Sequence, residues 1–249
     1  MVEQSKGKIA LVTGGNRGIG LETVKQLAQQ GMHVLLGARN EAKGREAADK
    51  LKGEKLDVEF ILLDVDDVKT HAQTAKTIEQ KFGKLDVLVN NAGILIDAKD
   101  KGGFPMASES SMETMRKTFD TNFFNVMALT QTLLPLIKKS DAGRIVFLSS
   151  GLASLTMHSD PKSPIYNYKP VAYDLSKTAL NAFAVHLAHE LRKTTIKVNI
   201  AHPGSVVTDM NAAGDIQVSE GAKTSVALAT LPADGYSGKF IHLGQELPW

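Results

Sequence analysis

The chain contains no cysteine. It therefore has no disulfide, thiolate zinc site, iron–sulfur cluster or cysteine nucleophile, and its composition suits a reducing compartment. An excess of charge of one sign is also lacking, because 29 Lys and Arg stand against 27 Asp and Glu. A net charge of +2 gives no support for binding to nucleic acid or to a membrane surface.

Long hydrophobic runs are absent as well, and no apolar stretch is long enough to span a bilayer. Residues 1–8 lead directly into a short apolar run and contain no signal-peptide core. We therefore expect a cytoplasmic protein that does not bind a membrane. A chain of 249 residues, 43% of them hydrophobic, can bury a substantial core, and we expect residues 1–249 to form a single domain.

Short apolar runs alternate along the chain with segments of helical periodicity. The predicted strands are 9–12, 34–36, 58–63, 85–89, 144–148, 196–201 and 238–243. The predicted helices are 19–30, 41–51, 68–82, 112–138, 173–192 and 220–229. Strands without strict polar alternation, each followed by a helix, are typical of an α/β protein with a parallel sheet covered on both faces. The sequence thus predicts a Rossmann-type doubly wound parallel sheet of about seven strands.

Three segments interrupt this alternation, namely residues 94–111, 151–172 and 203–218. Each of them follows the C-terminal end of a predicted strand. In an open parallel sheet, ligands bind at that edge. We therefore expect these loops to build a site rather than to link domains.

A glycine-rich turn, Thr-Gly-Gly-Asn-Arg-Gly-Ile-Gly at residues 13–20, joins the first predicted strand to the first predicted helix. Glycine lets the backbone turn tightly and approach a pyrophosphate closely, and the start of the helix adds free N–H groups. A glycine cluster alone is a weak motif and can be a purely structural turn. This one occupies the first strand–helix crossover, where the dinucleotide-binding fold requires it, and so predicts a bound dinucleotide.

The type of dinucleotide depends on the charge near the adenosine ribose. An acidic residue at the end of the second strand would bind a free 2′-hydroxyl, whereas arginine accommodates a 2′-phosphate. That strand ends at Arg39, and Arg17 lies inside the glycine-rich turn. Guanidinium groups suit phosphate by charge and by donor geometry. The alternative is that both are solvated surface residues, but the sequence favours NADPH/NADP+ over NADH.

Tyr173 and Lys177 are the candidates for proton transfer. Their spacing of four residues places both side chains on one face of a predicted helix. Reduction of a carbonyl by hydride leaves an alkoxide that needs a proton, and a tyrosine can supply it. A neighbouring ammonium group favours the phenolate, so we expect Lys177 to lower the pKa of Tyr173 from its usual value of roughly 10.

Ser150 follows the strand 144–148 at the same edge, where its hydroxyl could hydrogen-bond a substrate oxygen. For a lone serine, a strand-end cap is the simpler explanation. His186 and His189 lie three residues apart on one predicted helix but lack a third ligand. No metal is expected.

Together these features resemble the short-chain dehydrogenase/reductase family, in its single-domain branch, over nearly the whole chain. Further family motifs occur in the expected order, as Asp64-Val65, Asn90-Asn91-Ala92-Gly93, Asn122 in a helix, and Pro203-Gly204 followed by Thr208. Segments 35–40 and 220–232 look most like those of NADPH-dependent carbonyl reductases.

The resemblance implies a sheet order of 3-2-1-4-5-6-7 and four catalytic residues. Tyr173 would be the general acid/base, Ser150 would orient the carbonyl, Lys177 would hold the nicotinamide ribose, and Asn122 would position a water for proton relay. Asp64 and Val65 would contact the adenine, and Asn91 the adjacent ribose. The full set implied to bind the cofactor is Gly14, Asn16, Arg17, Gly18, Ile19, Gly20, Arg39, Asp64, Val65, Asn91, Ala92, Gly93, Tyr173, Lys177, Pro203, Gly204, Val206 and Thr208.

The function that follows is NADPH-dependent reduction of a ketone or aldehyde to an alcohol. One alternative is an alcohol or hydroxysteroid dehydrogenase that works in the oxidising direction. Another is a dinucleotide sensor without catalysis, because a fold alone does not prove an activity. A small hydrophobic carbonyl compound is the expected substrate, since the loops supply Ile94, Leu95, Leu152, Met157, Tyr166, Val206 and Met210.

The sequence departs from the family between Ser150 and Tyr173, where it carries a longer segment than is usual. Residues 155–170 would lie over the mouth of the active site as a partly apolar lid. In related monomeric reductases a still longer insertion covers the helix face that other members use to dimerise. A segment of intermediate length leaves both a monomer and a homo-oligomer open.

Overall fold

The computed structural model describes residues 5–97 and 103–249, so part of the predicted loop 94–111 lies outside the described residues. Within them, eight strands form one sheet with the order β3-β2-β1-β4-β5-β6-β7-β8. Neighbouring strands are parallel except for the last pair, β7 and β8. The strands are β1 (Ile9–Thr13), β2 (His33–Ala38), β3 (Val58–Leu62), β4 (Val87–Asn90), β5 (Arg144–Leu148), β6 (Lys197–Ala201), β7 (Phe240–His242) and β8 (Gln245–Glu246).

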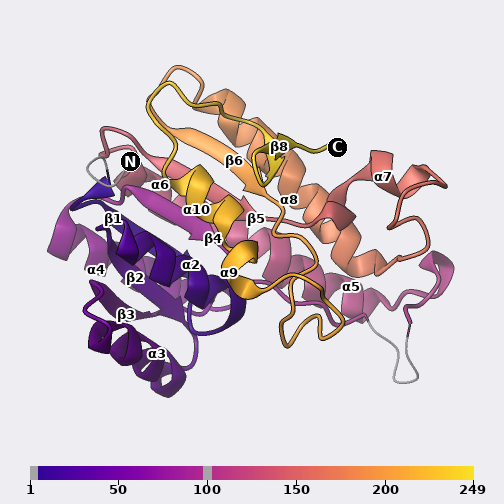
Figure 1. Cartoon of the computed structure of the whole chain (residues 1–249), viewed down its shortest axis with the longest axis horizontal. Helices are drawn as coiled ribbons and strands as arrows, with labels where there is room; N and C mark the ends of the chain where they lie inside the picture. The colour runs from indigo at the N-terminus through magenta and orange to yellow at the C-terminus, as the bar shows by residue number, and fades with distance from the viewer. Residues whose placement is uncertain (1–4, 98–102) are drawn as a thin grey trace.

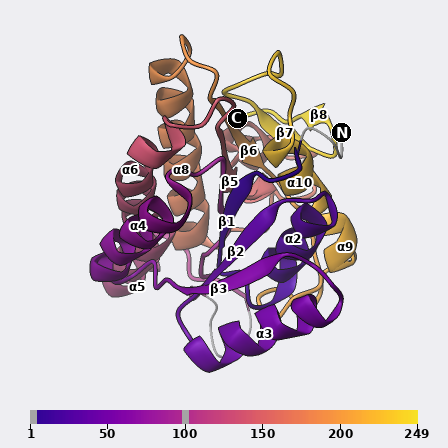
Figure 2. The ribbon, with the colours of Figure 1, turned by 90° about the vertical axis from the view of Figure 1, so that its left-hand side faces the viewer.

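The predicted Rossmann-type sheet and its order 3-2-1-4-5-6-7 are confirmed, and the antiparallel β8 is an addition. Figure 2 shows helices on both sides of the sheet, with α4, α6 and α8 on one side and α2, α3 and α10 on the other. The helical segments are α2 (Gly18–Gln29), α3 (Glu41–Gly53), α4 (Val68–Phe82), η1 (Ala107–Glu109), α5 (Met112–Phe119), η2 (Asp120–Phe124), α6 (Asn125–Ile137), η3 (Gly151–Ala153), α7 (Leu155–Ser159), α8 (Val171–Glu190), α9 (Val218–Gly221) and α10 (Lys223–Ala229).

The core lies in two layers because side chains along a strand point alternately to opposite faces. In β1, Leu11 packs into a cluster with Ile78 of α4 and Leu133 of α6. Val12 packs on the other face with Leu27 of α2. Burial on both faces explains why the strands are continuous apolar runs, as parallel sheets require.

The predicted helix 112–138 is interrupted in its middle. α5 and α6 are joined by η2, a π-helical segment that contains Asn122. π-Helical turns often occur at functional sites. The predicted helix 220–229 likewise divides into α9 and α10, and the segment expected to be an irregular lid contains the short helix α7. Most other boundaries differ from the prediction by one or two residues, as fraying helix ends do.

The carboxyl ends of the parallel strands meet at one edge of the sheet, where the long loops gather (Figure 1). Gly14 and Gly18 have φ angles of +64° and +55°, which the turn from β1 to α2 requires and which other residues rarely adopt. α3 begins beside the same edge, where the Asn40 side chain accepts a hydrogen bond from the Lys43 N–H at 2.9 Å. Within the described residues, no helix is long and apolar enough to cross a membrane.

Candidate active site

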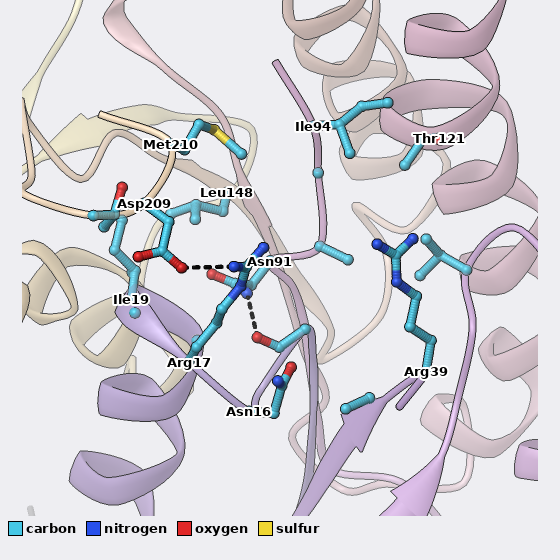
Figure 3. A pocket seen from close by; sticks show the side chains of 18 of the residues that line it. Asn16, Arg17, Ile19, Arg39, Asn91, Ile94, Thr121, Leu148, Asp209 and Met210 are labelled. Atoms are coloured by element: carbon cyan, nitrogen blue, oxygen red, sulfur yellow. Dashed lines mark hydrogen bonds and ion pairs between the residues drawn. The ribbon is translucent and has the colours of Figure 1, made fainter. Parts of the chain in front are cut away.

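A cleft of about 680 Å³ opens at this edge of the sheet (Figure 3), and its volume falls in the range of small-molecule sites. Its wall is formed by the glycine-rich turn, by the ends of β2, β3, β4 and β5, and by the loop after β6. Predicted cofactor residues that line it are Gly14, Asn16, Arg17, Gly18, Ile19, Gly20, Arg39, Asp64, Val65, Asn91, Ala92, Gly93, Tyr173, Lys177, Pro203 and Thr208.

Two features of the glycine-rich turn fit a phosphate group. α2 starts at Gly18, and Arg17, which precedes it, makes no side-chain cap hydrogen bond to the helix. The first N–H groups of α2 therefore stay available for an anion in the cleft. A Cβ on Gly20 would collide with the Gly14 carbonyl and the Asn91 amide, so only glycine allows this close packing.

Asn91 serves the turn itself. Its side-chain Nδ2 donates to the carbonyls of Thr13 at 2.8 Å and Gly14 at 3.2 Å. In return, the Thr13 hydroxyl accepts hydrogen bonds from the backbone N–H groups of Asn91 and Ala92, both at 2.9 Å. This reciprocal set binds the end of β4 to the glycine-rich turn and holds the floor of the cleft in place.

Basic side chains lie around the part of the cleft formed by the glycine-rich turn and the end of β2. Arg39 and Lys43 both line it, and no acidic residue ends β2. Arg17 is already paired, because its Nη1 lies 2.6 Å from Oδ2 of Asp209 in the loop after β6 (Figure 3). Sequence reasoning missed Lys43 and Asp209. The position of Lys43 on the first turn of the helix that follows Arg39 is the signal that could have found it.

The end of β3 contributes Asp64 and the buried Val65 to the cleft. The Asp64 carboxylate accepts a hydrogen bond from the backbone of Asp66 at 3.1 Å, which shapes the turn after the strand. Asp66 in turn accepts hydrogen bonds from the side chains of Thr121 and Asn125. Asp66 and Thr121 also line the cleft, and no sequence signal distinguishes them.

Tyr173 and Lys177 lie on one face of α8, with the Lys177 Nζ 5.7 Å from the centre of the Tyr173 ring. Nζ donates to the Leu148 carbonyl at 2.9 Å. Burial lowers the pKa of Lys177 to about 8. Burial also raises the pKa of Tyr173 to about 12, and a hydrogen bond with Ser150 only partly opposes this. The expected lowering of the phenol pKa by Lys177 is therefore wrong for the protein alone, because the loss of hydration on burial is the largest effect on the phenol.

Ser150 makes a contact that a strand-end cap would make, since its Oγ accepts from the Leu152 N–H at 3.2 Å. It is not among the residues that line the cleft, whereas the buried Ser149 is. Its hydrogen bond with Tyr173 nonetheless connects it to the phenol. The structure thus brings Ser150, Tyr173 and Lys177 together at the end of β5.

Asn122 acts as a brace within the π-helical segment. Its Oδ1 accepts from the Ile94 N–H at 2.8 Å, and its Nδ2 donates to the Ile94 carbonyl at 2.9 Å and to the Ser176 hydroxyl at 3.1 Å. A Cβ on Gly93 would lie 3.3 Å from Asn122 Oδ1 and 3.4 Å from the Lys177 amine. Asn122 therefore connects the loop after β4 to α8, next to Tyr173 and Lys177.

Only some of the predicted residues in the loop after β6 line the cleft. Pro203 and Thr208 line the cleft, and Gly204 adopts a φ of +87°. Val206 does not line it, because its side chain packs against Gly221 and leaves the neighbouring Val207 at the cleft. Sequence reasoning could not foresee this choice, which depends on the position of α9.

His202 is a residue that sequence reasoning missed. Its Nδ1 accepts from the Gly151 N–H at 2.9 Å, directly after Ser150. Burial, together with the nearby His242, lowers the pKa of His202 to about 4. The imidazole is therefore neutral, with its proton on Nε2, and it anchors the backbone beside Ser150.

Residues 155–170 do not line the cleft. They pack beside the first turn of α8 instead, where His158 lies 3.0 Å from Asp174. The ring of Tyr168 contacts the ring of Phe104 edge-on, with 4.8 Å between the two ring centres. Of the residues expected to face the substrate, Ile94 and Met210 line the cleft, and Leu95, Leu152, Met157, Tyr166 and Val206 do not. In the part of the chain that the structure describes, no group of three or more His, Asp or Glu side chains could hold a metal ion.

The family comparison agrees with this geometry. Residues 8–217 match the family model described as short chain dehydrogenase. The chain belongs to the short-chain dehydrogenase family. This membership, which the sequence motifs predicted, is confirmed.

Relatives of this short-chain dehydrogenase include enzymes named for reduction and for oxidation. It is 34% identical to salutaridine reductase of Papaver bracteatum, over 95% of this chain and 94% of that protein. It is 30% identical to (+)-neomenthol dehydrogenase of Capsicum annuum, over 94% and 95% of the two chains. The NADPH-bound carbonyl reductase from chicken fatty liver superposes with a TM-score of 0.84 and 25% identity, covering 98% of this chain and all of that one.

Proposed function

We propose that this short-chain dehydrogenase is an NADPH-dependent reductase of ketones or aldehydes, with Tyr173 as the proton donor. The observation that carries the proposal is the convergence of Ser150, Tyr173 and Lys177 beside a cleft whose other end is an uncapped helix N-terminus. Such a cleft combines a phosphate site with a proton donor, as a nicotinamide reductase requires.

The residues of the cleft fit NADPH. The N–H groups at the start of α2 would hold the pyrophosphate, and Asp64 with Val65 would contact the adenine. Arg39 and Lys43 supply positive charge for the 2′-phosphate, and the end of β2 has no carboxylate to bind a free ribose hydroxyl. When bound, NADPH supplies the hydride that reduces the carbonyl carbon. Structural relatives with bound NADP or NADPH support this choice of cofactor.

The protein's own residues orient the substrate oxygen and supply the proton that it needs. The Ser150 hydroxyl would orient the substrate oxygen and stabilise the negative charge that develops on it. Tyr173 would then donate its phenolic proton to that oxygen. Because burial keeps the pKa of Tyr173 at about 12, the phenol is protonated near neutral pH and is ready to act as an acid. Asn122, through its brace to Ile94 and Ser176, would keep the wall of the site and α8 in register.

The substrate that fits this wall is a small, largely apolar carbonyl compound. Ile94 and Met210 present apolar side chains to the cleft. The relatives named salutaridine reductase and (-)-isopiperitenone reductase support a reductase activity. The cytoplasmic location expected from the sequence remains part of this proposal.

The second candidate is an alcohol dehydrogenase that works in the oxidising direction, for which the relative named (+)-neomenthol dehydrogenase is the specific support. In that direction Tyr173 must first lose its proton, which its raised pKa opposes near neutral pH. Measuring the rates of reduction and of oxidation against pH therefore distinguishes the two candidates, because reduction needs the protonated phenol and oxidation needs the ionised one.

The experiment is to follow NADPH oxidation on a panel of aromatic and alicyclic ketones with wild-type protein and with Tyr173→Phe, and to repeat it with NADH. We expect turnover that prefers NADPH and falls by about 10²–10⁴-fold in the variant, the usual contribution of a general acid. Activity that survives loss of the phenol would overturn the mechanism. NADPH binding without turnover in either direction would favour a dinucleotide sensor.

A further inference from the structure

The helix that carries Tyr173 has an unusual start. α8 begins at Val171, and the preceding Pro170 makes no side-chain cap hydrogen bond. The first N–H groups of a buried helix need partners, and a carboxylate is a favourable one because it also complements the helix dipole. Here the partner comes from a distant part of the chain. Oδ2 of Asp97 accepts from the Ala172 N–H at 2.9 Å and lies 3.5 Å from the Tyr173 nitrogen.

Asp97 is itself firmly placed. Only 4% of the residue is exposed, and it follows three residues after Ile94, whose N–H and carbonyl are both bound by Asn122. The same Asn122 donates to the Ser176 hydroxyl, and Ser176 donates to the Tyr173 carbonyl at 2.7 Å. The backbone of Tyr173 is thus held on its amide side by Asp97 and on its carbonyl side through Ser176.

Asp97 also brings negative charge close to the phenol. Its Oδ1 is buried and has no hydrogen-bond partner within the described residues. The charges of Asp174 and Asp97 both raise the pKa of Tyr173, after the larger effect of burial. Burial first, and then the charge of Asp97, raise the pKa of Asp174 to about 8.

Within residues 5–97 and 103–249, few other charged or titratable groups lie around this turn of α8. His158 of α7 lies 3.0 Å from Asp174, and the Lys169 amine lies 2.8 Å from Nδ1 of His158. Tyr168 faces Tyr173 from the same segment, and Lys177 faces it from α8. Among these groups, only Asp97 both contacts the backbone N–H of Tyr173 and places a charge close enough to affect the Tyr173 phenol.

We propose that Asp97 is a positioning residue for the proton donor, which fixes Tyr173 at the start of α8 and sets the charge around its phenol. This inference rests on the proposed function of Tyr173. It gives the loop after β4 a role in the reaction through an acidic side chain that does not line the cofactor cleft.

Two substitutions separate position from charge. Asp97→Asn keeps an oxygen that can accept from the Ala172 N–H but removes the negative charge. Asp97→Ala removes both. Asp160→Asn is the matched control, because Asp160 is exposed and lies just after α7, and its bond to the Lys162 N–H survives the change.

The pH profile of ketone reduction is the first measurement. Reduction needs the protonated phenol, so its rate falls on the alkaline side as Tyr173 ionises. With the charge of Asp97 removed, the phenol ionises more readily, and the fall in Asp97→Asn should move to lower pH by roughly one unit. Well above pH 8, where the phenol titrates, Asp174 is charged in both proteins and does not offset the change. Asp97→Ala should also lower kcat by roughly 10-fold, with the KM for NADPH unchanged.

The second measurement is a titration of tyrosinate absorbance, which reports the pKa of the Tyr173 phenol without any turnover. The titration of Tyr173→Phe is subtracted from that of wild type, and the titration of the Tyr173→Phe/Asp97→Asn double variant is subtracted from that of Asp97→Asn. A lower phenol pKa in Asp97→Asn would support the inference even if wild-type protein reduced none of the ketones, which would defeat the proposed function alone. The inference would be overturned if Asp97→Asn changed neither the phenol pKa nor the pH profile, and if kcat in Asp97→Ala fell only in proportion to the folded fraction. Asp160→Asn should match wild type in every measurement.

Discussion

Arg17 of the glycine-rich turn and Asp209 of the loop after β6 form an ion pair of 2.6 Å at the cofactor cleft. The two residues are 192 positions apart in the sequence, and both side chains are more than two-thirds exposed. The guanidinium that the sequence assigned to the 2′-phosphate thus has a competing carboxylate of the same protein. An ion pair this exposed is weak, so phosphate can displace it at small cost.

Asp209→Asn should therefore tighten NADPH binding, because Arg17 no longer has to leave a carboxylate. We expect the Kd from fluorescence titration to fall by roughly 2–5-fold, the range of an exposed ion pair. Arg17→Ala should weaken binding and cancel the effect of Asp209→Asn in the double variant. Equal effects of Asp209→Asn with and without Arg17 would show that the ion pair does not compete with the cofactor.

Arg39→Asp should reverse the preference for NADPH. A carboxylate at the end of β2 would repel the 2′-phosphate and accept a hydrogen bond from a free ribose hydroxyl. The ratio of kcat/KM for NADPH to that for NADH should fall by roughly 100-fold, as expected when like charges are placed together. Lys50→Asp is the control, since it makes the same change of charge on an exposed position of α3 outside the cleft. A similar fall in this control would point to long-range charge instead of contact.

Gly20→Ala should disable the cofactor cleft. The new methyl group would meet the Gly14 carbonyl and the Asn91 amide, which together form the floor of the turn. We expect a loss of about 1–3 kcal/mol of stability from overpacking and a Kd for NADPH at least roughly 10-fold higher. Gly53→Ala, at the end of α3 with open space around it, should leave both quantities close to wild type. NADPH binding at wild-type strength in Gly20→Ala would contradict the assigned phosphate site.

Asp174 should make the protein less stable as pH rises from about 4 to 8. Its pKa is 3.8 in a free side chain and about 8 in the fold, so the folded protein binds an extra proton across this window. Stability falls with rising pH wherever the folded state holds the additional proton. Asp174→Asn should remove the penalty and raise Tm at pH 8 by roughly 3–6 °C, with no gain near pH 4. The same shift in Tm at both pH values would contradict a titrating carboxyl.

The sequence alone determined those features that depend on neighbours along the chain. Apolar runs separated by helical periodicity determined the doubly wound sheet, because each strand and helix shows its pattern within its own residues. The glycine-rich turn can be predicted from the sequence for the same reason, because the positive φ angles of Gly14 and Gly18 are a local requirement of the turn. Tyr173 and Lys177 share a helix face at a spacing that any α-helix provides.

Tertiary structure alone decided which groups meet across the sheet. The contact of Asp97 with the start of α8, the pair of Arg17 with Asp209 and the burial of Val206 against Gly221 each join segments far apart in sequence. The phenol pKa is decided in the same way. Spacing along one helix predicted that Lys177 lowers the phenol pKa, but the burial of Tyr173 by surrounding elements raises it instead. Hydration and charge act through space, so a one-dimensional pattern does not contain their balance.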